Sequence, residues 1–76
     1  MIDAAQVRMA RAGAKLSVKE LAALSGVADS TILRFETGKG AILATNLGRI
    51  QRALEEAGVV FLAADASGGP GVRTKV

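Results

Sequence analysis

The sequence predicts a mainly α-helical fold, in which four helices are followed by a short C-terminal β-strand or hairpin. Apolar residues recur at intervals of three and four up to Gly58, as they do on the buried face of a helix. Glycines stand where these recurrences stop, which is typical of helix ends. Beyond Gly58 the pattern changes to a β-prone apolar run. We therefore divide the 76-residue chain into a helical domain, 1–58, and a β tail, 59–76.

The first two helices each follow a residue that is suited to capping a helix. The first is predicted over Ala4–Ala12 after Asp3, and the second follows Ser17, which forms a capping box with Glu20. Gly26 ends the second helix, because glycine adopts a left-handed stop without steric cost. The inward residues are expected to be Val7 and Ala10 in the first helix, and Val18, Leu21, Ala22 and Ser25 in the second, with Val27 at the corner that follows.

The third helix is predicted to begin at Ala28 or Asp29 and to end at Gly38. The fourth is predicted over Ala44–Ala57, directly before Gly58. The second and third helices are only about eight to ten residues long, so each needs tertiary packing to be stable. The expected inward residues are Ala28, Thr31, Ile32 and Phe35 in the third helix, and Leu43, Leu47, Ile50, Leu54 and Ala57 in the fourth.

The tail has the pattern of a strand, a loop and a second strand. The run Val59–Ala63 is apolar on both faces, residues 65–70 are rich in turn formers, and Val72–Val76 alternates apolar with polar residues. Two strands alone are not stable in water. They are therefore expected either to pack on the helices of their own chain or to pair with a second copy.

The composition argues against an enzyme and against a metal or cofactor site. The chain has no histidine and no cysteine, which removes the usual acid–base, thiol and thiolate-metal chemistry. Glu55 and Glu56 are adjacent on a helix and point apart. The net charge of +3 favours polyanionic partners. With no visible secretion signal and no apolar run long enough for a bilayer, we expect a cytoplasmic protein without a membrane partner.

The stretch Leu16–Gly40 holds two helical patterns at a defined spacing. It reads L-S-x-x-E-L-A-x-x-x-G-V and then S-T-I-x-x-x-E-x-G, the second part beginning at Ser30. Weaker agreement extends outward to Gln6–Arg11 and to Leu47–Leu54. Over about three quarters of its length, the chain resembles the lambda-repressor-like helix-turn-helix family, also called the Cro-type or XRE family. The resemblance implies a four-helix domain that binds double-stranded DNA.

In this family the third helix lies in the major groove of DNA. Carried over by position, the resemblance implies base contacts by Asp29, Ser30 and Arg34. Arg34 is the strongest candidate because an arginine fork bonds bidentately to guanine, with a phosphate contact or a solvated side chain as its alternatives. Ser30 contacts a base or a phosphate, or is only a polar group of the first turn. For Asp29 we favour helix capping over cytosine readout.

The same resemblance implies contacts with the DNA backbone and one structural ion pair. The candidate phosphate contacts are Ser17, Lys19, Lys39, Thr45 and Asn46, with a solvated charge as the alternative for each lysine. Arg11 and Glu36 are expected to form a buried ion pair that holds the third helix against the first. Arg8 has no such partner in the pattern, and we interpret it as a phosphate contact or a surface residue.

Several positions depart from the family pattern. Val18 stands where a polar residue commonly touches DNA, and Leu24 and Leu33 are apolar where polar residues are usual. Leu33 is expected to pack either on a thymine methyl group or on a partner protein. The segment after Gly40 also lacks the proline often found there.

We interpret the chain as a sequence-specific transcriptional regulator. The predicted dimerisation element consists of Val59, Val60, Phe61 and Leu62, because its second face and its edge need a partner. A two-fold dimer would read an inverted repeat with half-sites about 34 Å apart. A hairpin that closes the chain's own core is the alternative to the dimer. The alternative function is a protein-interaction module on the same scaffold, such as an antitoxin-like partner or an adaptor to a transcription complex.

Overall fold

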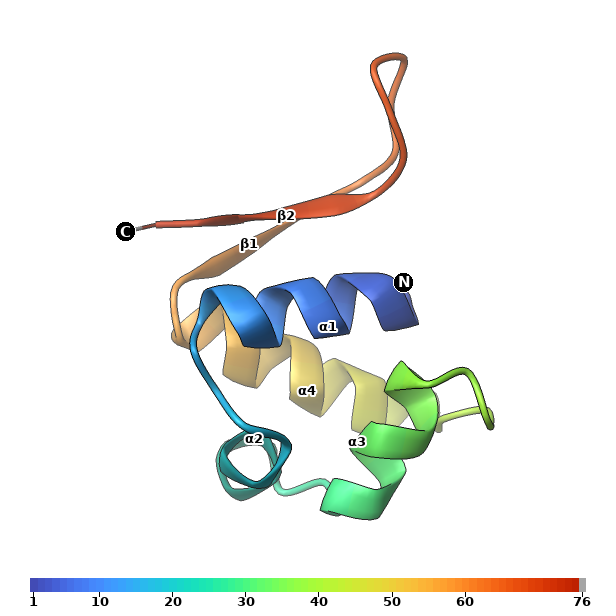
Figure 1. Cartoon of the computed structure of the whole chain (residues 1–76), viewed down its shortest axis with the longest axis vertical. Helices are drawn as coiled ribbons and strands as arrows, with labels where there is room; N and C mark the ends of the chain where they lie inside the picture. Colours follow the sequence, from blue (N-terminus) through green and yellow to red (C-terminus); the bar gives the residue numbers. More distant parts are fainter. Residues whose placement is uncertain (76) are drawn as a thin grey trace.

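The computed structural model describes residues 1–75, which form four α-helices followed by an antiparallel β-hairpin (Figure 1). The elements are α1 (Ala4–Gly13), α2 (Val18–Ser25), α3 (Asp29–Glu36), α4 (Ala44–Glu56), β1 (Val59–Leu62) and β2 (Gly71–Thr74). The predicted fold class is therefore confirmed. Val76, the last residue of the predicted second strand, lies outside the described residues. Within residues 1–75, no helix has the length and apolar character needed to cross a membrane.

The starts of α1 and α2 are both closed by capping boxes. At α2, Glu20 N donates to Ser17 Oγ at 3.0 Å, and Ser17 N donates to Glu20 Oε1 at 2.9 Å. Asp3 and Gln6 form the same reciprocal pair at α1. Asp3 caps α1 as predicted, whereas the role of Gln6 was not predicted, although its spacing of three residues from Asp3 is typical of a capping box. By contrast, α3 and α4 begin without any side-chain cap.

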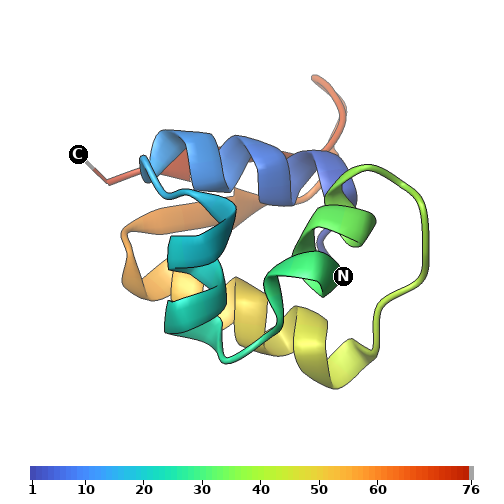
Figure 2. The ribbon, with the colours of Figure 1, turned by 60° about the horizontal axis from the view of Figure 1, so that its bottom comes forward.

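The turn between α2 and α3 is short and sharp. Gly26 ends α2 with a φ of +74°, in the left-handed region that favours glycine. Val27 follows at 4% exposure and fills the corner, as predicted. The chain therefore changes direction between the two short helices, which lie at an angle to each other in Figure 2.

One hydrophobic core joins the helices to the hairpin. Its most deeply buried side chains come from all four helices and β1, and include Val7, Leu21, Ile32, Ile50, Leu54 and Val59. Three predicted inward positions are wrong, since Ala28, Leu43 and Ala57 are exposed. Each of them caps its helix, so the periodicity of the regular helix no longer governs its direction. Ala53, which the predicted stripe left out, is 8% exposed and adds to the core face of α4.

The two strands pair with each other inside the chain. Their register runs from Val59 opposite Thr74 to Leu62 opposite Gly71. Successive side chains alternate between the two faces of the hairpin. The face towards the helices carries Val59, Phe61 and Val72, which pack in or against the core. Val60, Leu62 and Arg73 therefore belong to the other face.

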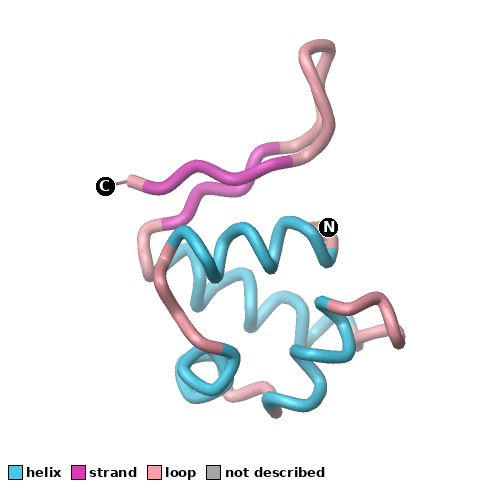
Figure 3. Tube along the Cα trace, in the orientation of Figure 1, coloured by secondary structure: helices cyan, strands magenta, loops and turns pink. Residues whose placement is uncertain are grey.

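Two contacts fasten the hairpin to α1. Gln6 Nε2 donates to the main-chain oxygens of Leu62 at 3.1 Å and of Gly71 at 3.0 Å. At the other end of α1, a Cβ on Gly13 would lie 2.9 Å from Thr74 Cγ2, so strand and helix approach closely there. The hairpin lies on the side of α1 that faces away from α2 and α3, as the helix and strand colours of Figure 3 make plain.

Candidate nucleic-acid interface

The third helix presents the three predicted base-contact residues to solvent. Asp29, Ser30 and Arg34 are all exposed, and α3 stands at the front of the molecule in Figure 2. On its opposite side, Ile32 is fully buried and Glu36 is 2% exposed. Because the buried side of α3 packs in the core, its exposed side chains project from a backbone that is held in place.

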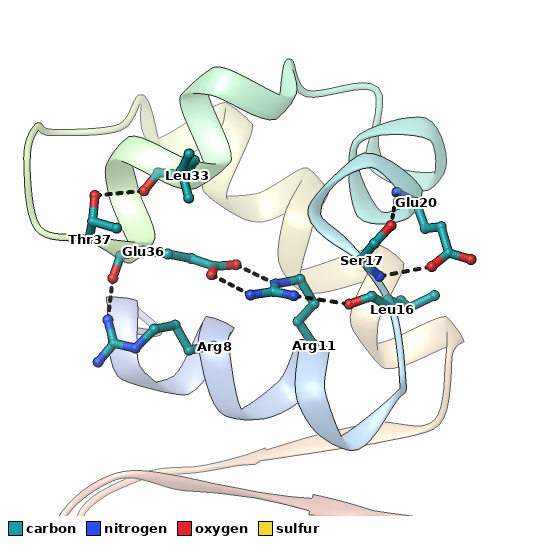
Figure 4. Close-up of polar contacts among 8 residues, drawn as sticks. All are labelled: Arg8, Arg11, Leu16, Ser17, Glu20, Leu33, Glu36 and Thr37. Atoms are coloured by element: carbon teal, nitrogen blue, oxygen red, sulfur yellow. Dashed lines mark hydrogen bonds and ion pairs between the residues drawn. The ribbon is translucent and has the colours of Figure 1, made fainter.

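An ion pair joins α1 to the end of α3 (Figure 4). Arg11 Nε donates to Glu36 Oε2 and Arg11 Nη2 donates to Glu36 Oε1, both at 2.9 Å. The hydrogen bond to the Glu36 carboxylate raises the pKa of the Arg11 guanidinium. A third bond, from Arg11 Nη1 to Leu16 O at 3.1 Å, reaches the segment before α2. One side chain of α1 therefore fixes both helices of the helix-turn-helix.

Arg8 is exposed, and it contacts the end of α3 through a main-chain oxygen, a contact that the sequence did not predict. Its Nη1 donates to the main-chain oxygen of Glu36 (Figure 4), the last residue of α3. The final carbonyls of a helix have no partner within it, and a cation there also favours the helix dipole. The only local signal for this contact is that Arg8 and Arg11 lie three residues apart, on the same side of α1.

The start of α2 carries two predicted phosphate contacts, Ser17 and Lys19, both exposed. The hydrogen bonds with Ser17, above all the one from its amide, lower the pKa of Glu20. A carboxylate charge therefore stands beside Ser17 at neutral pH. An approaching phosphate would meet the hydroxyl proton of Ser17 and the ammonium of Lys19, but it would also meet this negative charge.

Our preference for Asp29 as a capping residue is wrong. The N-cap position of α3 is Ala28, and no side chain caps this helix start. Asp29 is instead the first residue of α3, where its charge favours the helix dipole and its side chain is exposed. Its carboxylate is therefore open to solvent and not engaged as the cap of its helix.

Arg34 lies beside the segment that joins α3 to α4. A Cβ on Gly40 would be 3.2 Å from Arg34 Nη2, so the guanidinium rests over a position without a side chain. The chain turns back at Gly38, where φ is +71°, and Lys39 N donates to Arg34 O at 2.9 Å. Lys39 is exposed. This short stretch thus brings two cations to the C-terminal end of the exposed face of α3.

The remaining predicted phosphate contacts, Thr45 and Asn46, lie in the first turn of α4. Thr45 is exposed and Asn46 is half-buried. The N-cap residue Leu43 makes no side-chain hydrogen bond to this turn. The first amides of α4 therefore have no side-chain cap, and an open helix start of this kind attracts anions.

The helical part of the chain is similar to a known protein family. A family model described as helix-turn-helix matches residues 7–58, which is more than half of the chain. The match includes α2, α3 and α4 and ends directly before β1. A search of the curated proteins finds no match. The chain therefore belongs to the lambda-repressor-like, XRE-type helix-turn-helix family of DNA-binding regulators.

Proposed function

We propose that this chain recognises a specific double-stranded DNA sequence by inserting α3 into the major groove. The arrangement of α3 carries the proposal: one face is exposed and mostly polar, while Ile32 and Glu36 fix the other face to the core. An α-helix fits the major groove, where each base pair offers a distinct pattern of donors and acceptors. A helix held from behind can present its side chains to those patterns with little further ordering.

Three side chains of α3 are assigned to the base edges. Arg34 donates bidentately to O6 and N7 of a guanine, a pairing that discriminates between bases by about 1–3 kcal/mol. Asp29 accepts from N4 of a cytosine, since its carboxylate is not engaged as an N-cap. Ser30, one residue further into the first turn, hydrogen-bonds a base or a neighbouring phosphate.

Contacts with the sugar-phosphate backbone set the register of α3 without reading the sequence. Lys39 follows α3, and Thr45 and Asn46 open the uncapped start of α4. Ser17 and Lys19 contribute from the start of α2, where the charge of Glu20 weakens the attraction. We therefore expect the stronger phosphate contacts at Lys39 and at the start of α4.

Selection from random DNA duplexes at two salt concentrations tests this proposal. We expect a preferred site, and an affinity that falls steeply as salt rises because bound counterions are released. Arg34→Ala should relax the preference for guanine. Lys39→Ala should weaken all sequences alike and reduce the slope of log affinity against log salt by about 0.9. Lys75→Ala removes the same charge beyond β2 and serves as the control, with no effect on either measure.

The proposal fails if no sequence is enriched over the starting pool. The docking of α3 fails if a site is enriched but Arg34→Ala and Lys39→Ala bind it as the unchanged protein does.

We propose further that two copies associate through their hairpins. In β1, Val59 and Phe61 pack against the core of their own chain, so Val60, Leu62 and the open strand edges remain for a partner. A two-fold pair would bind an inverted repeat, with half-sites about 34 Å apart if α3 of each copy enters successive turns of one DNA face. The selected site would show the half-sites and their spacing directly.

Sedimentation of the purified protein tests the association. We expect a dimer whose fraction rises with concentration, and Val60→Lys should shift it to the monomer. Ala64→Lys, an exposed change beyond β1, is the control. A monomer mass at every concentration would eliminate the dimer.

One observation favours protein binding as a second candidate function. Leu24 is 61% exposed and lines a shallow groove of about 330 Å³ with Arg49 and Arg52 of α4. An apolar segment with acidic residues would suit this groove. Under this alternative, a purified acidic partner forms a stoichiometric complex that Leu24→Lys abolishes, and random DNA yields no preferred site.

A further inference from the structure

We infer that Leu33 reads a thymine, by packing against its 5-methyl group in the major groove. The inference rests on the proposed function and adds a fourth side chain of α3 to the base contacts. Leu33 is 52% exposed, and it belongs to the same helix as the exposed residues assigned to base contacts, Asp29, Ser30 and Arg34. Its side chain belongs neither to the hydrophobic core nor to the ion pair between Arg11 and Glu36.

The surroundings of Leu33 suit a single methyl group better than a protein partner. Its exposed neighbours three and four positions away on α3 are Asp29, Ser30 and Thr37, all of them polar. Protein docking sites generally present a contiguous apolar patch of a few hundred Å². Leu24, the other exposed leucine of the helix-turn-helix, lines the groove against α4 instead. Within α3, Leu33 is thus the exposed large apolar side chain, and its exposed helix neighbours are polar.

The major groove offers an apolar group that a leucine side chain can contact. Base edges there offer donors, acceptors and one apolar group, the C5-methyl of thymine. A leucine side chain can neither donate nor accept a hydrogen bond, so a guanine, cytosine or adenine edge facing it would lose its bond to water without replacement. Thymine is therefore the base that Leu33 favours, close to the guanine assigned to Arg34.

The backbone at Leu33 is held in place before DNA arrives. Thr37 Oγ1 donates to Leu33 O at 2.8 Å (Figure 4). The preceding residue, Ile32, is fully buried, and Glu36 on the next turn is bound by Arg8 and Arg11. Because the helix is fixed on both sides of Leu33, contact with a methyl group needs only the ordering of one side chain.

Replacing single thymines of the selected site with deoxyuridine tests the inference, because the exchange removes the methyl group and keeps the base pair. We expect one position in each half-site at which the unchanged protein loses about fourfold in affinity, the value for burial of one methyl-sized group. Leu33→Ala should bind thymine and deoxyuridine equally at that position. Leu24→Ala removes a comparably exposed leucine outside α3 and should keep the fourfold difference.

Three outcomes would overturn the inference while leaving the proposed function intact. They are a selected site without thymine, deoxyuridine tolerated at every position, and a Leu33→Ala variant that still distinguishes the two bases. Failure to select any site would instead overturn the proposed function itself, so the two failures are distinguishable.

Discussion

The helical part of the chain and the hairpin are held in place in different ways. Each helix contributes fully or almost fully buried side chains to the core, and two arginines of α1 bind the end of α3. The hairpin contributes one side chain of that kind, Val59, and is otherwise fastened by Gln6 and by the close approach at Gly13. A segment with few buried contacts opens at a lower free energy than the core. The surface assigned to DNA therefore belongs to the more strongly held region.

The first helix, α1, contacts α3 on one side and the hairpin on the other. Arg8 and Arg11 face α3, whereas Gln6 and Gly13 face the strands. Changes on the two sides of α1 should thus have separable effects. Changes towards α3 should lower the stability of the whole domain, and changes towards the hairpin should loosen the strands first.

The largest effect is expected from Arg11→Ala. The change leaves the carboxylate of Glu36, which is 2% exposed, without its bidentate partner. Removing one member of a buried pair costs about 3–5 kcal/mol, and we expect the lower end because Arg11 itself is 25% exposed. Urea unfolding followed by circular dichroism measures the loss.

A double variant separates a buried unpaired charge from a general loss of packing. Arg11→Met combined with Glu36→Leu removes both charges and should recover most of the stability lost in Arg11→Ala. If the double variant is less stable than Arg11→Ala, the unpaired carboxylate is not the cause of the loss.

A smaller and more local effect is expected from Gln6→Ala. It leaves the carbonyl oxygens of Leu62 and Gly71 without their side-chain donor, at a cost of about 2 kcal/mol for two hydrogen bonds, and it also removes the acceptor of the Asp3 amide at the start of α1. Hydrogen exchange should speed up at the amides of β1 and β2 more than at those of α2 and α3. Gln51→Ala, which removes a hydrogen bond on the surface of α4, is the control. Equal acceleration in helices and strands would show that the two regions open together.

Gly13→Ala tests the second fastening point. Alanine normally stabilises a helix by about 0.8–1 kcal/mol over glycine. Here the new Cβ would lie 2.9 Å from Thr74 Cγ2, so we expect a net destabilisation of about 1 kcal/mol instead. Thr74→Ser removes that methyl group and should restore the ordinary preference for alanine. If Gly13→Ala alone raises the stability, the strand yields without cost and this contact does not hold the hairpin.

Features that depend on residues close together in the chain were predictable from the sequence, whereas contacts between distant segments were not. The capping box of Ser17 and Glu20 and the stop at Gly26 are local, because their partners lie within a few residues, and local spacing carries them. The partner of Arg8 lies 28 residues away, and those of Gln6 lie 56 and 65 residues away. No periodicity connects residues at such distances, so these contacts depend on how the elements pack.

In the candidate site too, some features were predictable from the sequence and others were not. The exposure of Ser30 and Arg34 follows from the periodicity that buries Ile32, and the ion pair of Arg11 with Glu36 was implied by the family resemblance. Helix ends were harder, since Ala28 was predicted inward and Asp29 was favoured as a cap. Both errors come from one cause, because a capping position is defined by the backbone geometry at the helix start and not by residue type alone.

The smallest effects are expected on the pKa values of two carboxylates, one in the helical part of the chain and one in the hairpin. Hydrogen bonds with Ser17 hold the pKa of Glu20 below its usual 4.5, and hydrogen bonds with Ser67 hold that of Asp65 below its usual 3.8. A lowered pKa in the folded state means that the stabilisation is complete above the usual value and is lost as pH falls through the lowered one. Carboxyl titrations by NMR should place both groups below these values. Ser17→Ala keeps the amide that lowers the pKa of Glu20 most, so it should raise that pKa only part of the way, and Ser67→Ala should raise the pKa of Asp65. Each change should affect its own carboxylate alone, because α2 and the hairpin tip lie at opposite ends of the molecule (Figure 1). If either substitution shifted the pKa of both carboxylates, the helical part and the hairpin would be coupled. Changes on the two sides of α1 would then not have separable effects.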